Sequence, residues 1–377
     1  MVTFASMDSI TQIVLGAACG EIALGKKIGN KAILFGAIGG TIPDLDVLIG
    51  SLYYSNEIDS LAFHRGFMHS IIFAILGAFI FGFISSKAYD YGPKRKGTTN
   101  LKDWIWLFFL SIFTHPILDS FTPYGTQLFL PFSGYRVAFN NIAVADPLYT
   151  LPFLLCMIIA MFFNRKNPTR RRWTKAGLYL SSAYMIFTIG NKIYVNQTFK
   201  KSFQKANINY SKFSAQPTIL NNVLWYAVAE TDKNYTMAFY SIFDNNTRPT
   251  NFINIPKNHT LVDVNHPDIR TLRWFSNEFY TLSILDNKII YKDLRYPLLD
   301  LRDSTSSLFS FELIKNSSLD VHLAPLISVR LQPCQPDTPS RCGNIPISTH
   351  GLVVCSVDST NTNPGSPNSL IDFIKPE

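Results

Sequence analysis

The sequence predicts a mainly α polytopic membrane protein of about six transmembrane helices, followed by a small, mostly β extracytoplasmic domain and a disordered tail. Hydrophobic residues form 47% of the 377-residue chain and charged residues only 16%. Nearly all the long apolar runs lie before residue 191, and alternating aromatic and β-branched residues follow them. We therefore expect a membrane-embedded domain at 7–191, a mostly β domain at 192–330 and a disordered tail at 331–377.

Six apolar stretches account for the expected spans, because a transmembrane helix needs about 20 mostly apolar residues. They are residues 10–24, 32–50, 67–86, 104–121, 147–163 and 176–191. The third and fifth meet this requirement directly. The first, fourth and sixth are short or carry polar residues.

Basic residues in the short loops predict how these spans are oriented. They concentrate after the first, third and fifth spans: Lys26, Lys27, Lys31, Lys87, Lys94, Arg95, Lys96, Lys102, Arg165, Lys166, Arg170, Arg171, Arg172 and Lys175. The alternate loops, 51–66 and 122–146, contain only Arg65 and Arg136. Because Lys and Arg favour cytoplasmic loops, we expect both chain ends outside the cytoplasm. The net charge of +8 is then a topology signal, and we expect no nucleic-acid partner.

With this topology, the acidic and imidazole side chains of the spans fall at one membrane face. They are Asp8, Asp44, Asp46, His64, His69, His115, Asp119 and Asp146, with Arg65 among them. Random scatter would have left some of them at the opposite ends. Ionisable groups beside hydrocarbon are costly, so their convergence indicates a functional site.

The local spacings in this set fit a metal site. His115 and Asp119, at i and i+4, share one face of a helix. Asp44 and Asp46 follow Pro43 and suit a broken helix end that lines a polar cavity. Imidazoles and carboxylates are ligands of divalent metals, with zinc expected and manganese or iron as alternatives. The candidate metal ligands are Asp8, Asp44, Asp46, His64, His69, His115 and Asp119.

The chemistry expected of such a site is hydrolysis. A bound divalent ion can lower the pKa of water to about 7 and supply a hydroxide nucleophile. Arg65 could hold an anionic oxygen in a bidentate fork, and we assign catalytic roles to Arg65 and Asp119. Asp8 and Asp146 also fit helix N-caps. A transporter or a metal-dependent structural protein would use the same Asp/His cluster, but transporters usually place such residues near the membrane midplane.

Several motifs, in order, resemble the YdjM-type family of membrane-bound metal-dependent hydrolases. They are "MDSITQ", "PDLD", "HRGFMHS", "THPILDSFTPYGT" and "ADPLY", and the resemblance covers about residues 7–165. It implies an integral protein of a bacterial inner membrane, and the charge of the loops places the C-terminal domain outside the cytoplasm. Many members of that family carry a histidine where this chain has Gln12. If that histidine is a ligand, one metal position is weakened or filled differently here.

The resemblance also suggests the class of substrate. The His-x-x-x-Asp element at His115 and Asp119 is similar to that of zinc-dependent phospholipase C and related nucleases. A phosphoester or another ester, in particular one of a membrane lipid, is therefore the expected substrate, and the lipid bilayer is the expected surrounding.

The second half of the chain reads as strands and then as a polar tail. "VLWYAVAETDKNYTMAFYSIF" and "EFYTLSILDNKIIYKDLRYP" show partial alternation with turn signals between the runs. We expect this domain to cover the site, select the substrate or bind a partner. Pro, Ser, Thr and Asn dominate after residue 331, a composition typical of disorder.

Overall fold

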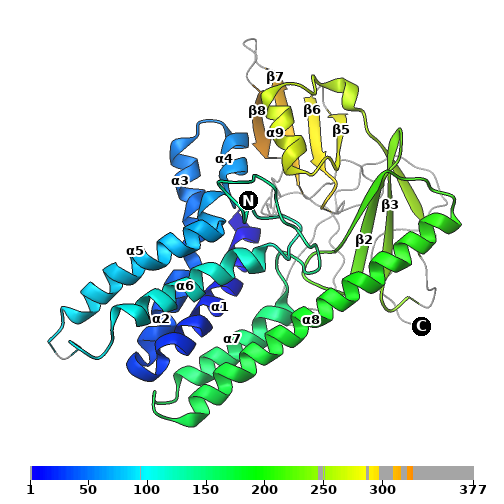
Figure 1. The fold of residues 1–377 in the computed structure, drawn as a ribbon. Coiled ribbons are helices and arrows are strands. Elements are labelled where there is room, and N and C mark those ends of the chain that lie inside the picture. The colour runs from blue at the N-terminus through cyan, green and yellow to red at the C-terminus, as the bar shows by residue number, and fades with distance from the viewer. Residues whose placement is uncertain are drawn as a thin grey trace, which may run out of the picture. The chain divides into compact units, whose positions relative to one another are not determined.

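The computed structural model shows a helical N-terminal region followed by two β-sheets (Figure 1). It describes residues 2–93, 95–244, 249, 251–285, 288–296, 309–315 and 321–325, with the backbone alone at 2–8, 314–315 and 321–325. The tail expected at 331–377 lies outside the described residues.

Helices form in each of the six stretches expected to span the membrane, and a further short helix forms in the expected loop 51–66. The helices of the stretches are α1 (Val2–Ile28), α2 (Asn30–Thr41), α3 (Asp46–Tyr53), α5 (Ile71–Asp90), α6 (Leu101–Asp119), α7 (Pro147–Met161) and α8 (Pro168–Lys205), and the helix of the loop is α4 (Glu57–Phe63). Two single turns of 3₁₀ helix, η1 (Pro43–Leu45) and η2 (Phe67–His69), separate some of them.

The expected number of six spans is not supported. Within the described residues, α5 and α6 are long and apolar enough to cross a membrane. A third crossing is added if α2 and the segment Pro43–Tyr53, which are bent by 44°, count as one broken span. The 15 residues of α7 rise only about 22 Å, short of a hydrocarbon core of about 30 Å. α8 begins with a run of basic residues and continues to Lys205, past the expected end at residue 191.

Helices α1 and α2 pack closely because glycines face one another. A Cβ atom at Gly16 would clash with the carbonyl oxygen of Gly36 and would lie only 2.8 Å from the Cα atom of Gly40. Small residues let helix backbones approach in this way. α6 packs on the same pair, with the Ser111 hydroxyl 3.3 Å from the Gly16 carbonyl oxygen. This packing brings the backbone of Gly40 next to the end of α6.

The two ends of the helical region differ in charge. The α1–α2, α5–α6 and α7–α8 connections, which have the basic residues within them or in the adjoining helix turns, lie toward the same end of the helices in Figure 1. The bend at η1, the turn at η2 before α5, and the last turn of α6 lie at the other end. Between them, α5 leaves Ile75, Phe79 and Phe83 about half exposed, as expected of a lipid-facing surface.

A small β region follows the helices, as the sequence predicts. β1 (Lys212–Pro217), β2 (Leu224–Glu230), β3 (Asn234–Ser241) and β4 (Phe252–Pro256) form one antiparallel sheet in sequence order. β5 (Tyr280–Leu285), β6 (Lys288–Asp293), β7 (Ser310–Lys315) and β8 (Val321–Pro325) form a second one. The expected strand segments are the β2–β3 and β5–β6 hairpins.

Each sheet packs on a helix. The last turns of α8 bury Phe199 and Phe203 against Trp225 of the first sheet. The second sheet is covered by α9 (Pro267–Phe275), whose short amphipathic pattern the sequence reading missed. The apolar core between α9 and the second sheet also includes Leu61 of α4 and Tyr124 of the loop that follows α6. The second sheet therefore contacts the helical region at the polar end of the spans.

Candidate metal centre

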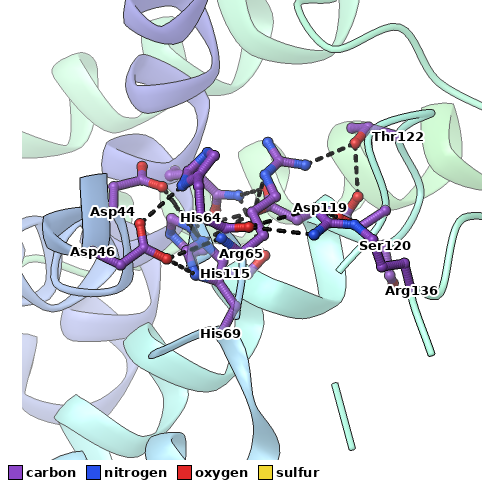
Figure 2. Close-up of polar contacts among 12 residues, drawn as sticks. Asp44, Asp46, His64, Arg65, His69, His115, Asp119, Ser120, Thr122 and Arg136 are labelled. Carbon is purple, nitrogen blue, oxygen red and sulfur yellow. Dashed lines mark hydrogen bonds and ion pairs between the residues drawn. The ribbon is translucent and has the colours of Figure 1, made fainter. Parts of the chain in front are cut away.

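Three helix ends bring the polar residues together in one place (Figure 2). Asp44 lies in η1, where Pro43 ends the helical run of α2. His69 ends η2, just before α5 begins. His115 and Asp119 occupy the last turn of α6, next to Pro116. The last three of these side chains are buried, whereas the carboxyl group of Asp44 is 28% exposed.

Four acceptor atoms converge within this group. The Nε2 atoms of His69 and His115 lie 3.1 Å apart. Asp44 Oδ1 lies 3.5 Å from the first and 3.3 Å from the second, and Asp119 Oδ2 lies 3.4 Å from both. The ligand atoms of Asp44, His69 and His115 all fall within 4.8 Å of one another, a spacing that suits one metal ion.

The partners of the imidazole Nδ1 atoms indicate which ring nitrogen carries the proton. His115 Nδ1 lies 2.6 Å from the Gly40 carbonyl oxygen, which can only accept. His69 Nδ1 lies 3.0 Å from Asp46 Oδ2, also an acceptor. When Nδ1 carries the proton, as these neighbouring acceptors favour, the Nε2 atom of each neutral ring carries a lone pair. Among the described residues Asp119 Oδ2 accepts no hydrogen bond. The Arg65 guanidinium lies 3.2 Å from that oxygen, and a further cation, either a proton or a metal ion, would offset the remaining repulsion among the four acceptors.

Asp46 lies beside this cluster and faces the Nδ1 atoms of two histidines, His64 and His69. Its Oδ1 atom lies 2.8 Å from Nδ1 of His64, and its Oδ2 atom accepts the backbone N–H of Arg65 at 3.0 Å while facing His69. Both of its oxygens thus face donors. A carboxylate on the far nitrogen of a ligating histidine is a common arrangement that fixes the ring and raises its basicity. The contacts place Asp46 and His64 beside the four-acceptor group rather than in it.

The two histidines outside the spans differ in their electrostatics. Burial lowers the pKa of His64, and the hydrogen bond to Asp46 offsets this only in part. Burial would also lower the pKa of His69, but the carboxylates of Asp119, Asp44 and Asp46 raise it to about 9. The cluster therefore attracts positive charge to His69.

Arg65 is fixed at the centre of the site. Its backbone adopts a left-handed conformation (φ 59°), rare for a bulky residue. Its Nε atom lies 3.2 Å from Asp119 Oδ2, and Nη1 donates to the Thr122 hydroxyl at 3.0 Å. The ring of Tyr124 lies 4.7 Å from the guanidinium carbon. The side chain is 3% exposed, so these contacts assign it to Asp119 rather than to an open anion site.

Gln12 occupies the position where many members of the resembled family carry a histidine. Its Nε2 atom donates to Asp119 Oδ1 at 2.6 Å and to the His115 carbonyl oxygen at 3.2 Å. It thus holds the Oδ1 atom of Asp119, while Arg65 faces the Oδ2 atom of the same carboxylate. The side chain of Asp8 lies outside the described residues. Asp146 caps α7 by accepting the N–H of Leu148, the alternative that the sequence left open.

Two arginines that the sequence reading did not single out fix the loop after α6. Arg136 donates to the Gly125 carbonyl oxygen at 3.0 Å, and its guanidinium carbon lies 5.0 Å from the centre of the Tyr124 ring. Arg295, which pairs with Asp293 at the end of β6, donates to the carbonyl oxygen of Pro123 at 3.2 Å. Arg136 was visible as one of only two basic residues in the outer loops. Arg295 had no such signal, because the Pro123 carbonyl oxygen to which it donates lies 172 positions away in sequence.

The comparisons with known proteins concern the helical region. The sequence profile of a family described as YdjM inner membrane protein matches residues 7–195. The uncharacterized protein YfhP of Bacillus subtilis (strain 168) is 31% identical over 160 residues, 41% of this chain and 46% of that protein. The inner membrane protein YbcI of Escherichia coli (strain K12) is 33% identical over 109 residues, 28% of this chain and 57% of that protein.

These matches span about half the length of each of the two curated relatives. No solved structure is significantly similar to the chain.

Proposed function

The chain belongs to the YdjM family of inner membrane proteins, and from this premise we propose that its Asp/His cluster holds one divalent metal ion for hydrolysis of a phosphoester. The observation that carries the proposal is the convergence of four acceptors, from Asp44, His69, His115 and Asp119. Two imidazoles and two carboxylates suit zinc, and manganese or iron accept the same ligands.

The surrounding residues would prepare the site for this chemistry. A divalent ion supplies Lewis acidity and lowers the pKa of water to about 7 in zinc hydrolases. Asp46 and the Gly40 carbonyl oxygen turn the Nε2 atoms of His69 and His115 toward the ion position. Arg65 offsets the charge of Asp119 and holds it in place. The partly exposed Asp44 marks the side from which water and substrate enter.

The surface beside Asp44 favours a substrate with an apolar part. α3 begins two residues later and exposes Leu48 by 61%, Leu52 by 88% and Tyr53 by 79%. Exposed apolar patches of this kind mark membrane or ligand contacts, and aromatic residues favour the membrane interface. We infer that the phosphoester belongs to a membrane lipid.

The charge of the loops supports an orientation for this site. The basic connections lie at the end of the helices opposite the metal centre. Since basic loops favour the cytoplasm, the site and the β region would face the outside of the inner membrane.

The test is metal-dependent hydrolysis by the full chain in nanodiscs. Phospholipid substrates would be followed by mass spectrometry of the released headgroup, and bis(p-nitrophenyl) phosphate by absorbance. We expect turnover with zinc or manganese that falls at least about 100-fold on chelation and in Asp119→Asn, because a neutral amide is a poor ligand and no longer pairs with Arg65.

The matched control is Asp59→Asn, an exposed carboxylate on α4 that should leave turnover unchanged. Metal-loaded protein that hydrolyses none of these phosphoesters would contradict the hydrolase proposal and leave a structural or transport role for the same cluster. Turnover that survives chelation would also contradict it.

A further inference from the structure

A second polar feature lies at the opposite end of the helices from the metal centre. A cavity of about 750 Å³ opens between the end of α1 and the start of α8. Six basic residues line it, namely Lys26, Arg165, Lys166, Arg170, Arg171 and Lys175. Glu21 is the one acidic residue in its lining. The cavity is therefore strongly cationic.

The buried part of the cavity is already neutralised. Arg170 and Glu21 form a bidentate pair, with Nε to Oε1 at 2.7 Å and Nη2 to Oε2 at 2.6 Å. Arg170 also donates to the Phe163 carbonyl oxygen at 3.0 Å. Both side chains are more than nine-tenths buried. This pair stabilises the contact between α1 and α8 and contributes no net charge.

The remaining five cations lack such a partner. Within the part of the chain that the structure describes, none of Lys26, Arg165, Lys166, Arg171 and Lys175 pairs with a carboxylate. Like charges around one concave surface repel and focus a positive potential. The positive-inside rule explains basic residues in these loops. It does not require them to surround a cavity, so an anion is the natural occupant.

The wall of the cavity distinguishes a lipid from a small soluble anion. Ile22 is 58% exposed and Tyr179 is 69% exposed, and both line it together with Leu178. These side chains lie on the two helices that frame the opening, α1 and α8. They offer apolar contact next to the cations, as an acyl chain attached to a phosphate would need. Basic pockets between membrane helices on the cytoplasmic side bind anionic lipid headgroups in this manner.

We propose that this cavity binds the phosphate headgroup of an anionic membrane lipid, with the lipid chains along the apolar wall of α1 and α8. The headgroup would contact Arg171 and Lys175, one turn apart on α8, and Lys26 on α1. The site is separate from the metal centre and requires no catalytic step.

The experiment titrates dioctanoyl phosphatidylglycerol into the detergent-solubilised full chain and counts bound lipid by native mass spectrometry. A chelator is present throughout, so that hydrolysis at the metal centre cannot consume the lipid. We expect saturable binding of one lipid, and roughly 30-fold weaker affinity in Arg171→Gln/Lys175→Gln, because each cation near a lipid surface contributes roughly fivefold.

The charge-matched control is Lys96→Gln/Lys102→Gln, which removes two exposed cations, one in the α5–α6 connection and one in the first turn of α6, without touching the cavity. Its affinity should equal that of the unmodified chain. An equal loss in both double variants would contradict the proposal, as would unchanged binding in the cavity variant. Equal binding of dioctanoyl phosphatidylcholine, or displacement of the lipid by glycerol 3-phosphate at similar concentration, would overturn the assignment to an anionic lipid.

Discussion

Replacing His115 by alanine is expected to weaken metal affinity by more than about 100-fold. Loss of a residue that only orients a ligand costs about 10–100-fold, and loss of a ligand costs more. The imidazole provides one of the four converging acceptors and is fully buried. The alanine variant leaves the carboxylates of Asp44 and Asp119 with His69 as their single imidazole. Competition titration against a fluorescent zinc indicator measures the effect.

His259→Ala is the matched control for this substitution. His259 stacks on Tyr280 in the β region, with ring centroids 4.1 Å apart, and is not one of the four converging acceptors. Its loss should leave zinc affinity unchanged. Zinc affinity in His115→Ala equal to that of the unmodified chain would show that the imidazole is not a ligand.

Replacing Arg170 by methionine is expected to destabilise the helical region by about 3–5 kcal/mol, because it leaves the carboxylate of Glu21 buried without a partner. The double variant Glu21→Gln/Arg170→Met removes both charges and should recover most of that loss. Thermal unfolding in detergent, followed by circular dichroism, measures all three proteins under one condition.

The neighbouring Arg172 provides the control for charge alone. It is exposed, so Arg172→Met should change stability by no more than about 0.5 kcal/mol. If Arg170→Met unfolds at the same temperature as Arg172→Met, the buried pair does not stabilise the contact between α1 and α8.

The sequence alone placed the four converging side chains at one membrane face, together with Asp46 and His64, which lie beside them in the structure. His115 and Asp119 share a helix face by their spacing, and the apolar pattern placed Asp44 and His69 at the same membrane face. Those are local or periodic signals, and the structure brings the four side chains together. The β2–β3 and β5–β6 hairpins followed from alternation in the same way.

The individual contacts required the packing of distant helices. Asp46 follows Asp44 by two residues in the same motif, yet it faces the Nδ1 atom of His69 instead of the acceptor group. The η1 turn sends the two carboxylates in different directions. Gln12 reaches Asp119 because glycines let α1 and α2 approach closely and α6 packs against both. Neither the contact of Asp46 with His69 nor that of Gln12 with Asp119 can be predicted from the spacing of residues in the sequence.

The number of spans could not be predicted from the hydropathy of the sequence. α7 is apolar but too short for a full crossing. The apolar stretch at 176–191 proved to be the middle of α8, a 38-residue helix that starts among basic residues and ends against the first sheet. An apolar run reports burial in hydrocarbon or in protein equally well, and helix length decides between them only once the ends are known.

The most direct test of the metal centre is the metal content of the unmodified full chain, purified in detergent without chelator and measured by elemental analysis. We expect about one equivalent of zinc, manganese or iron per chain, since the four acceptors of Asp44, His69, His115 and Asp119 converge on a single position. Folded protein that contains no such metal and takes up none from millimolar zinc or manganese would contradict the account, and would leave protons as the cations that hold the cluster together.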